Sequence, residues 1–128
     1  MCFFKNNNQL EHQVSSEDVY VYKIFFKDWK DSSILHPVMY RTSMCYKVGD
    51  EVVPKDNISV DYLDKELVLT NGVIHSYNKE RINKMCAGKQ LDNYVAVVKC
   101  TIPAGTPYWT NIFGEITSTK IIIQEVIH

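Results

Sequence analysis

The stretch Val19–Lys27, VYVYKIFFK, decides the fold of this chain, because all but two of its residues are β-branched or aromatic. Side chains of a β-strand alternate between two faces. One face of this stretch would carry Tyr20, Tyr22, Ile24 and Phe26. The opposite face would carry Val19, Val21, Lys23, Phe25 and Lys27. The pattern predicts a β-strand with two chemically distinct sides.

Other segments carry the same β-strand signal at lower density. The Asn71-Gly72 dipeptide supplies the two positive φ angles of a type I′ turn, so it predicts a hairpin between the segments on either side of it. Val38–Lys47 is expected to be a strand that forms a hairpin with Val19–Lys27. His36-Pro37 would mark the start of that strand, because proline has no N–H to donate to the middle of a sheet. The further predicted strands are Val38–Lys47, Leu67–Thr70, Val73–Tyr77, Tyr94–Cys100 and Lys120–Ile127.

Residues Asn78–Ala87 predict the one helix of the chain, with Asn78 as its N-cap and Gly88 just past its end. Strands interrupted once by a helix predict an α+β fold: a single small domain with a mostly antiparallel β-sheet of about six strands and one short helix. Residues 1–18 are expected to be a flexible or weakly ordered N-terminal arm, and residues 19–128 a single β-rich domain.

Length, composition and charge narrow the function classes. The chain has 128 residues, of which 45% are hydrophobic and 12% aromatic, enough for one ordinary globular core. Its formal net charge is -1, and Arg41 and Arg81 are its only arginines. Proteins that bind nucleic acid generally carry a clear basic excess, so no general nucleic-acid binding is expected.

The chain shows no signal for export or metal binding. Its first apolar run stops at Phe4 and no run is long enough to cross a membrane, so we expect a cytoplasmic protein with no membrane partner. Cysteines are then expected to be reduced. A zinc site from Cys86, Cys100 and either His36 or His75 fits no standard spacing, so we expect no metal and no cofactor.

His75 is one candidate functional residue, because it stands between the Asn71-Gly72 turn and the predicted helix start. A strand end and a helix N-terminus often form a polar pocket there. One reading makes His75 the general base of a small nucleotide-processing enzyme. The other makes it a histidine that only satisfies a backbone carbonyl, and both readings stay open.

Aromatic and basic side chains suggest a ligand pocket. A mixture of tyrosine, tryptophan, arginine and histidine suits stacking on a base and holding a phosphate. The alternative is that the tyrosines simply cover sheet faces. The candidate ligand-binding residues are Tyr40, Arg41, His75, Tyr77, Arg81, Tyr108 and Trp109, with Tyr46 nearby.

The acidic segment 50–66 suggests a different class of function. It is expected to be a solvated, loop-rich excursion, and its carboxylates resemble the regular charge of nucleic-acid phosphates. A protein–protein inhibitor of a host nuclease would bind its partner through Asp56, Asp61 and Asp64.

Four short segments share a layout with known proteins: Tyr46–Gly49, Gly72–Tyr77, Val97–Tyr108 and Gly114–Ile121. They resemble a group of short phage and prophage proteins. That group has a Tyr-Lys-x-Gly turn, a Gly-x-His-x-aromatic segment leading into a helix, a strand ending Cys-x-Ile-Pro-x-Gly, and a final strand after Gly-Glu. The resemblance spans about residues 19–127, and this chain departs from it at residues 50–70.

The resemblance implies a phage-type counter-defence protein that acts by binding in the host cytoplasm. Our first hypothesis is a non-catalytic binding protein that sequesters a nucleotide-derived small molecule. The alternatives are an anti-CRISPR-like or nuclease inhibitor of a host defence protein, and the small enzyme with His75 as base. The strands at Val19–Lys27 and Lys120–Ile127 also offer edges through which a homo-oligomer can form.

Overall fold

The computed structural model describes residues 3–5, 13–38, 45–54, 59–63, 66–71, 73–88 and 90–128. Their strands are β1 (Phe3–Lys5), β2 (Val19–Lys27), β3 (Leu35–Pro37), β4 (Glu51–Val52), β5 (Ser59–Leu63), β6 (Glu66–Asn71), β7 (Ile74–Tyr77), β8 (Val95–Ile102), β9 (Tyr108–Thr110), β10 (Glu115–Ser118) and β11 (Ile121–Val126). The helix α1 is Lys79–Cys86.

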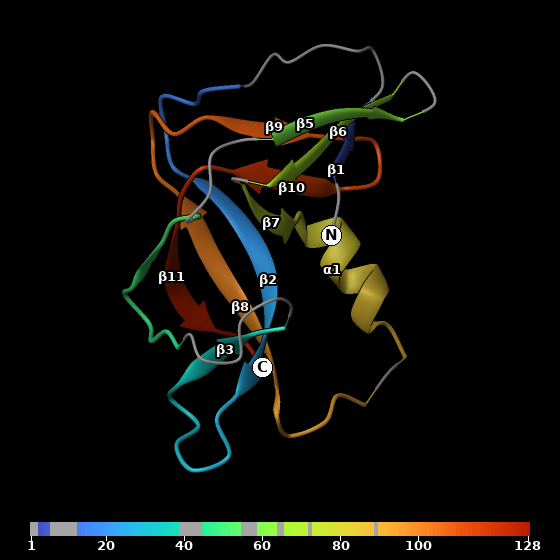
Figure 1. The fold of residues 1–128 in the computed structure, drawn as a ribbon. Helices are drawn as coiled ribbons and strands as arrows, with labels where there is room; N and C mark the ends of the chain where they lie inside the picture. The colour runs from blue at the N-terminus through green and yellow to red at the C-terminus, as the bar shows by residue number, and fades with distance from the viewer. Residues whose placement is uncertain are drawn as a thin grey trace.

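The strands form one large sheet and one small sheet, and all their pairings are antiparallel. The large sheet has the order β4-β11-β8-β2-β7-β10-β9, with β3 also paired to β2, and the small sheet has the order β1-β6-β5. In Figure 1, β2, β8 and β11 run side by side, and β9 and β10 cross above them. This confirms the predicted α+β class, with one helix in the part of the chain that the structure describes.

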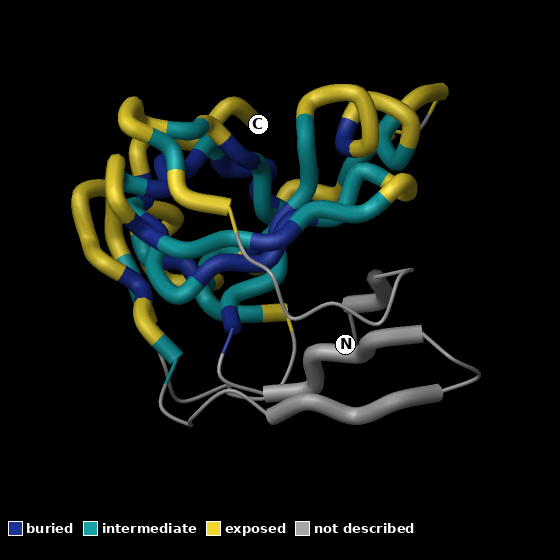
Figure 2. The backbone as a smooth tube through the Cα atoms, turned by 90° about the horizontal axis from the view of Figure 1, so that it is seen from above, coloured by how far each residue is buried: buried dark blue, intermediate teal, exposed yellow. Residues whose placement is uncertain are grey.

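The strand β2 is the centre of the large sheet. It pairs with β8 over all but its last residue, from Val19 opposite Ile102 to Phe26 opposite Val95. Its other edge pairs with β7 at Tyr22 and with β3 from Phe25 to Lys27. Figure 2 shows the buried residues gathered in the middle of the sheet and the exposed ones mainly in the turns.

The inner face of the sheet holds the hydrophobic core. Val21 and Phe25 of β2 are fully buried there, as the alternation in the sequence predicts. The core cluster comprises Val21, Phe25, Leu35, Val52, Ala96, Val98, Cys100, Ile102, Ile116, Ile121 and Ile123.

The helix α1 begins and ends where the sequence predicts. The side chain of Asn78 accepts a hydrogen bond from the Arg81 backbone N–H at 2.8 Å, which satisfies one of the free donors of the first turn. Gly88 follows the last turn with a φ of +66°, a conformation that glycine adopts without strain. The Asn78 N–H donates to the carbonyl of Gly114, which ties α1 to the β9–β10 turn.

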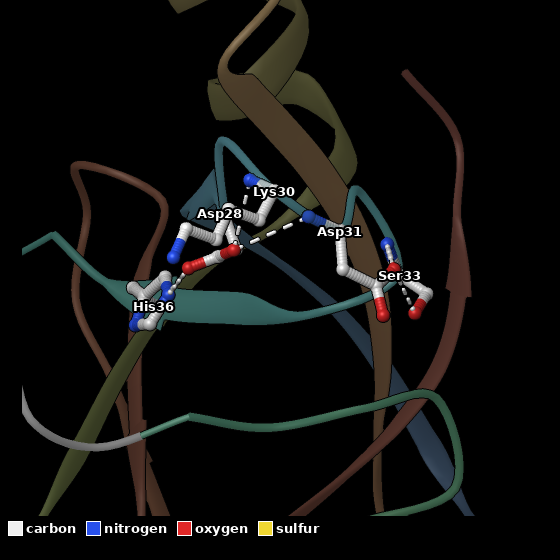
Figure 3. Close-up of polar contacts among 5 residues, drawn as sticks. All are labelled: Asp28, Lys30, Asp31, Ser33 and His36. Carbon is white, nitrogen blue, oxygen red and sulfur yellow. Dashed lines mark hydrogen bonds and ion pairs between the residues drawn. The ribbon is translucent and has the colours of Figure 1, made fainter.

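The turn between β2 and β3 is held by two aspartates (Figure 3). Asp28 accepts hydrogen bonds from the backbone N–H groups of Lys30 and Asp31, and its other oxygen lies 2.8 Å from His36 Nε2. Asp31 accepts from both the N–H and the hydroxyl of Ser33. These contacts lower the pKa of both carboxyls, for Asp28 chiefly through His36 and for Asp31 chiefly through Ser33.

The predicted hairpin at Asn71-Gly72 was wrong. β6 pairs with β1 and β5 in the small sheet, whereas β7 pairs with β10 and β2 in the large one. Ile74 of β7 packs against the core of the large sheet, and this burial outweighs the local preference for a turn.

Other boundaries also differ from the sequence expectations. The partner of β2 in the hairpin is Leu35–Pro37 rather than Val38–Lys47, and residues 39–44 lie outside the described residues. Proline is tolerated in β3 because, on the side away from β2, the described pairing of β3 is a single bridge between Leu35 and Tyr46 that does not involve Pro37. Segment 50–66 was expected to be loop, but it contributes β4 and β5, and Val52 is buried in the core.

Parts of residues 1–18 pair with the sheets, and both strands that were expected to offer free edges have partners on each side. Within residues 1–18, β1 pairs with β6, and Gln13 bridges to Tyr108. The strand β2 lies between β8 and β7, and β11 lies between β4 and β8, so the expectation that either is a free edge was wrong.

Among the described residues, no helix has the length and apolar character needed to span a membrane.

Replacing Gly114 by alanine should destabilise the fold more than the same change at Gly49. Both glycines have positive φ angles, +77° and +98°, but a Cβ at residue 114 would lie 2.8 Å from the Arg81 Cβ while residue 49 has nothing within 4 Å. The expected extra loss in the free energy of unfolding is about 1–2 kcal/mol, measured by urea denaturation. Equal losses would show that Gly114 is not a packing point between α1 and β10.

Candidate functional site

The outer face of β2 carries exposed tyrosines instead of core residues. The side chain of Tyr20 is 51% exposed, and Tyr22, two residues further along the same face, is half-buried. The Lys99 ammonium lies 4.2 Å from the centroid of the Tyr20 ring. The Lys79 ammonium lies 4.8 Å from the centroid of the Tyr22 ring. Each ring therefore has a lysine ammonium over one face.

Tyr77 extends this surface across the sheet onto β7. It is the residue opposite Tyr22, so its side chain projects from the same face. Burial raises the pKa of Tyr77, the carboxylate of Glu115 raises it further, and the Arg81 guanidinium lowers it. Arg81, exposed on α1, therefore lies within electrostatic range of the Tyr77 hydroxyl.

We call this surface the tyrosine face. It combines three phenol rings with three cations that come from β8 and from the first turn of α1. Its residues are Tyr20, Tyr22, Tyr77, Lys79, Arg81 and Lys99.

His75 also lies on this side of the sheet, opposite Thr117 of β10. It is half-buried, and burial together with the charge of Lys23 lowers its pKa to about 4. The imidazole is therefore neutral at neutral pH and a weak base, because an efficient general base has a pKa near the working pH.

Lys23 is a charged residue on the inner face of β2. Its ammonium donates a hydrogen bond of 2.7 Å to the backbone carbonyl of His75, next to the point where β2 and β7 pair at Tyr22. Burial lowers the pKa of Lys23 to about 8, although the nearby Cys100 sulfur acts in the opposite direction. Burial also raises the pKa of the Cys100 thiol to about 12, so that thiol stays protonated and unreactive.

The structure brings together some of the ligand-binding residues predicted from the sequence. His75 and Tyr77 lie on β7 and Trp109 lies on β9, on the far side of β10. The three project from one side of the sheet, because Thr117 of β10 pairs with both His75 and Trp109. Trp109 is buried there. Tyr108 projects from the opposite side and packs against the core. Tyr40 and Arg41 lie outside the described residues.

The acidic residues of the alternative partner surface are only partly placed. Asp56 and Asp64 lie outside the described residues, and Asp61 belongs to β5, opposite Val68.

Tyr20, Tyr22, Lys79 and Lys99 were not among the residues selected from the sequence. The alternation of Val19–Lys27 had already put the two tyrosines on one face. The alternation could not identify the lysines that contact these tyrosines. Lys99 lies beside them because β8 pairs with β2, and Lys79 lies beside them because α1 is next to β2.

In the part of the chain that the structure describes, no group of three His, Cys, Asp or Glu side chains is arranged to hold a metal ion. Of the described cysteines, Cys100 is buried and Cys86 half-buried, while Cys45 is exposed, and none forms a disulfide. Comparison with protein-family models, curated proteins and solved structures found no match.

Stability should fall as the pH drops from about 6.5 to 4, in part because of His75. In that window the unfolded chain binds a proton at this histidine and the folded chain does not, so the free energy of unfolding rises with pH. The expected contribution is about 1–2 kcal/mol, since the side chain keeps some contact with water. Denaturation of the wild type and His75→Gln at several pH values should show a flatter profile for the variant; an unchanged slope would contradict this account.

Proposed function

We propose that this protein binds a nucleotide-type small molecule on the tyrosine face and holds it without changing it. The observation that carries the proposal is the pair of tyrosine rings, Tyr20 and Tyr22, each with a lysine ammonium over its face. A base stacks on an aromatic ring, and a phosphate is attracted to a nearby ammonium. The tyrosine face supplies both partners within one surface.

The lysines suit this role because they are flexible. A cation over an exposed ring contributes only about 0.5–1 kcal/mol. Stacking of a base on the same ring is worth about 1–3 kcal/mol, so an arriving base can displace the ammonium. The displaced Lys79 or Lys99 then stays beside the base, where it can pair with the phosphate.

The charge of the tyrosine face differs from that of the whole chain. The net charge is -1, whereas this surface has Lys79, Arg81 and Lys99 against two carboxylates: Glu115, which acts on Tyr77, and Glu125, which is opposite Lys99 on β11. A local cluster of this kind attracts a small anion without creating the broad basic surface that long nucleic acids require.

Binding is favoured over turnover by the state of His75. A histidine with a pKa of about 4 is a poor proton acceptor at neutral pH, which weakens the hypothesis that it is a general base. In the setting that the phage resemblance suggests, such a protein would remove a nucleotide signal of the host by sequestering it.

The double variant Lys79→Gln/Lys99→Gln should bind adenosine 5′-monophosphate about tenfold more weakly than the wild type, because it loses both ring-stacked cations. Its affinity should also depend less on salt concentration. Isothermal titration calorimetry at two salt concentrations measures both effects.

Lys30→Gln is the matched control, because the Lys30 ammonium also lies 4.8 Å from the centroid of an exposed ring, that of Trp29, but on the β2–β3 turn. This variant should bind like the wild type. A wild type that does not bind the nucleotide, or equal losses in the double variant and the control, would refute the tyrosine face as the binding site.

A further inference from the structure

We infer that the ligand of the tyrosine face carries two bases joined through a phosphate, an inference that rests on the proposed function. Tyr20 and Tyr22 project from the same face of β2 and are two residues apart. At the rise of a β-strand, their backbone positions are about 7 Å apart. The face therefore offers two separate stacking positions in a row.

This spacing selects a particular state of the ligand. Bases in a duplex follow one another at about 3.4 Å, roughly half the separation of the two tyrosine positions. Two linked bases can occupy Tyr20 and Tyr22 only when they are unstacked from each other, as in single strands that bind to aromatic side chains on a sheet. A paired and stacked duplex does not fit this arrangement.

Lys99 is positioned to meet the phosphate between the two bases. Its backbone on β8 lies opposite Tyr22, whereas its ammonium extends diagonally to within 4.2 Å of the Tyr20 ring centroid. The side chain therefore runs from one stacking position to the other, where the linking phosphate of a two-base ligand would lie. Lys79 stands over the Tyr22 ring, at the start of α1.

The row ends after two positions. The next residue on the same face is Ile24, which has no aromatic ring, and the following one is Phe26. The Phe26 ring packs against Tyr94, with 5.7 Å between the ring centroids. A third base in sequence thus meets an aliphatic side chain, so two bases fill the row.

The test compares three ligands by calorimetry: adenosine 5′-monophosphate, the linear 5′-phosphorylated dinucleotide pApA, and the corresponding single-stranded tetranucleotide. We expect pApA to bind about tenfold more tightly than the mononucleotide, because a second base stacks. The tetranucleotide should bind within about threefold of pApA, because the next position along β2 on this face is Ile24, which has no ring.

Single substitutions test whether the rings of Tyr20 and Tyr22 cause the higher affinity for pApA. Tyr20→Val and Tyr22→Val keep good strand formers at both positions, and each should reduce the advantage of pApA over the mononucleotide to about threefold or less. Tyr94→Val is the control, because Tyr94 is an exposed tyrosine outside the row and should leave the advantage unchanged.

The outcomes separate this inference from the proposed function. If the wild type binds the mononucleotide and pApA equally well, the two-base ligand is refuted while nucleotide binding stands. If the tetranucleotide gains a further tenfold or more, the limit of two positions is refuted. If no ligand binds, the proposed function fails and the inference fails with it.

Discussion

The long antiparallel pairing of β2 with β8 is the constraint on which the rest of the structure depends. It fixes the register from Val19 opposite Ile102 to Phe26 opposite Val95, so every side chain of β2 is committed to one side of the sheet. A slip of one residue would bring Tyr20 and Tyr22 into the core and expose Val21. The same pairing that buries the core thus displays the tyrosines and brings Lys99 to them.

Lys23 links the two sides of the sheet. By alternation it belongs to the inner face, where an unpaired ammonium would be costly. Its hydrogen bond to the carbonyl of His75 uses a backbone acceptor beside the β2–β7 pairing and gives that charge a partner. The charge also helps keep His75 neutral. Lys23 of the central strand thus affects both the backbone hydrogen bonding and the pKa of His75 on β7.

The sequence predicted local features well and long-range partners poorly. Val19–Lys27 matches β2, and the helix signals from Asn78 to Gly88 match α1, because periodicity and capping depend on neighbouring residues. The Asn71-Gly72 hairpin failed because β6 and β7 join different sheets, which local turn chemistry does not encode. Likewise, the candidate pocket included Tyr108, which faces the core, and omitted Lys99, which reaches Tyr20 only through strand pairing.

The most direct test of the central claim is to follow the tyrosine ring resonances by nuclear magnetic resonance while pApA is added. Stacked bases shift the ring signals of the residues they cover. The account predicts large shifts for Tyr20 and Tyr22, a smaller one for Tyr77, and none for Tyr46 and Tyr108, which pack against the core. Shifts confined to Tyr46 and Tyr108, or no shift at saturating ligand, would contradict it.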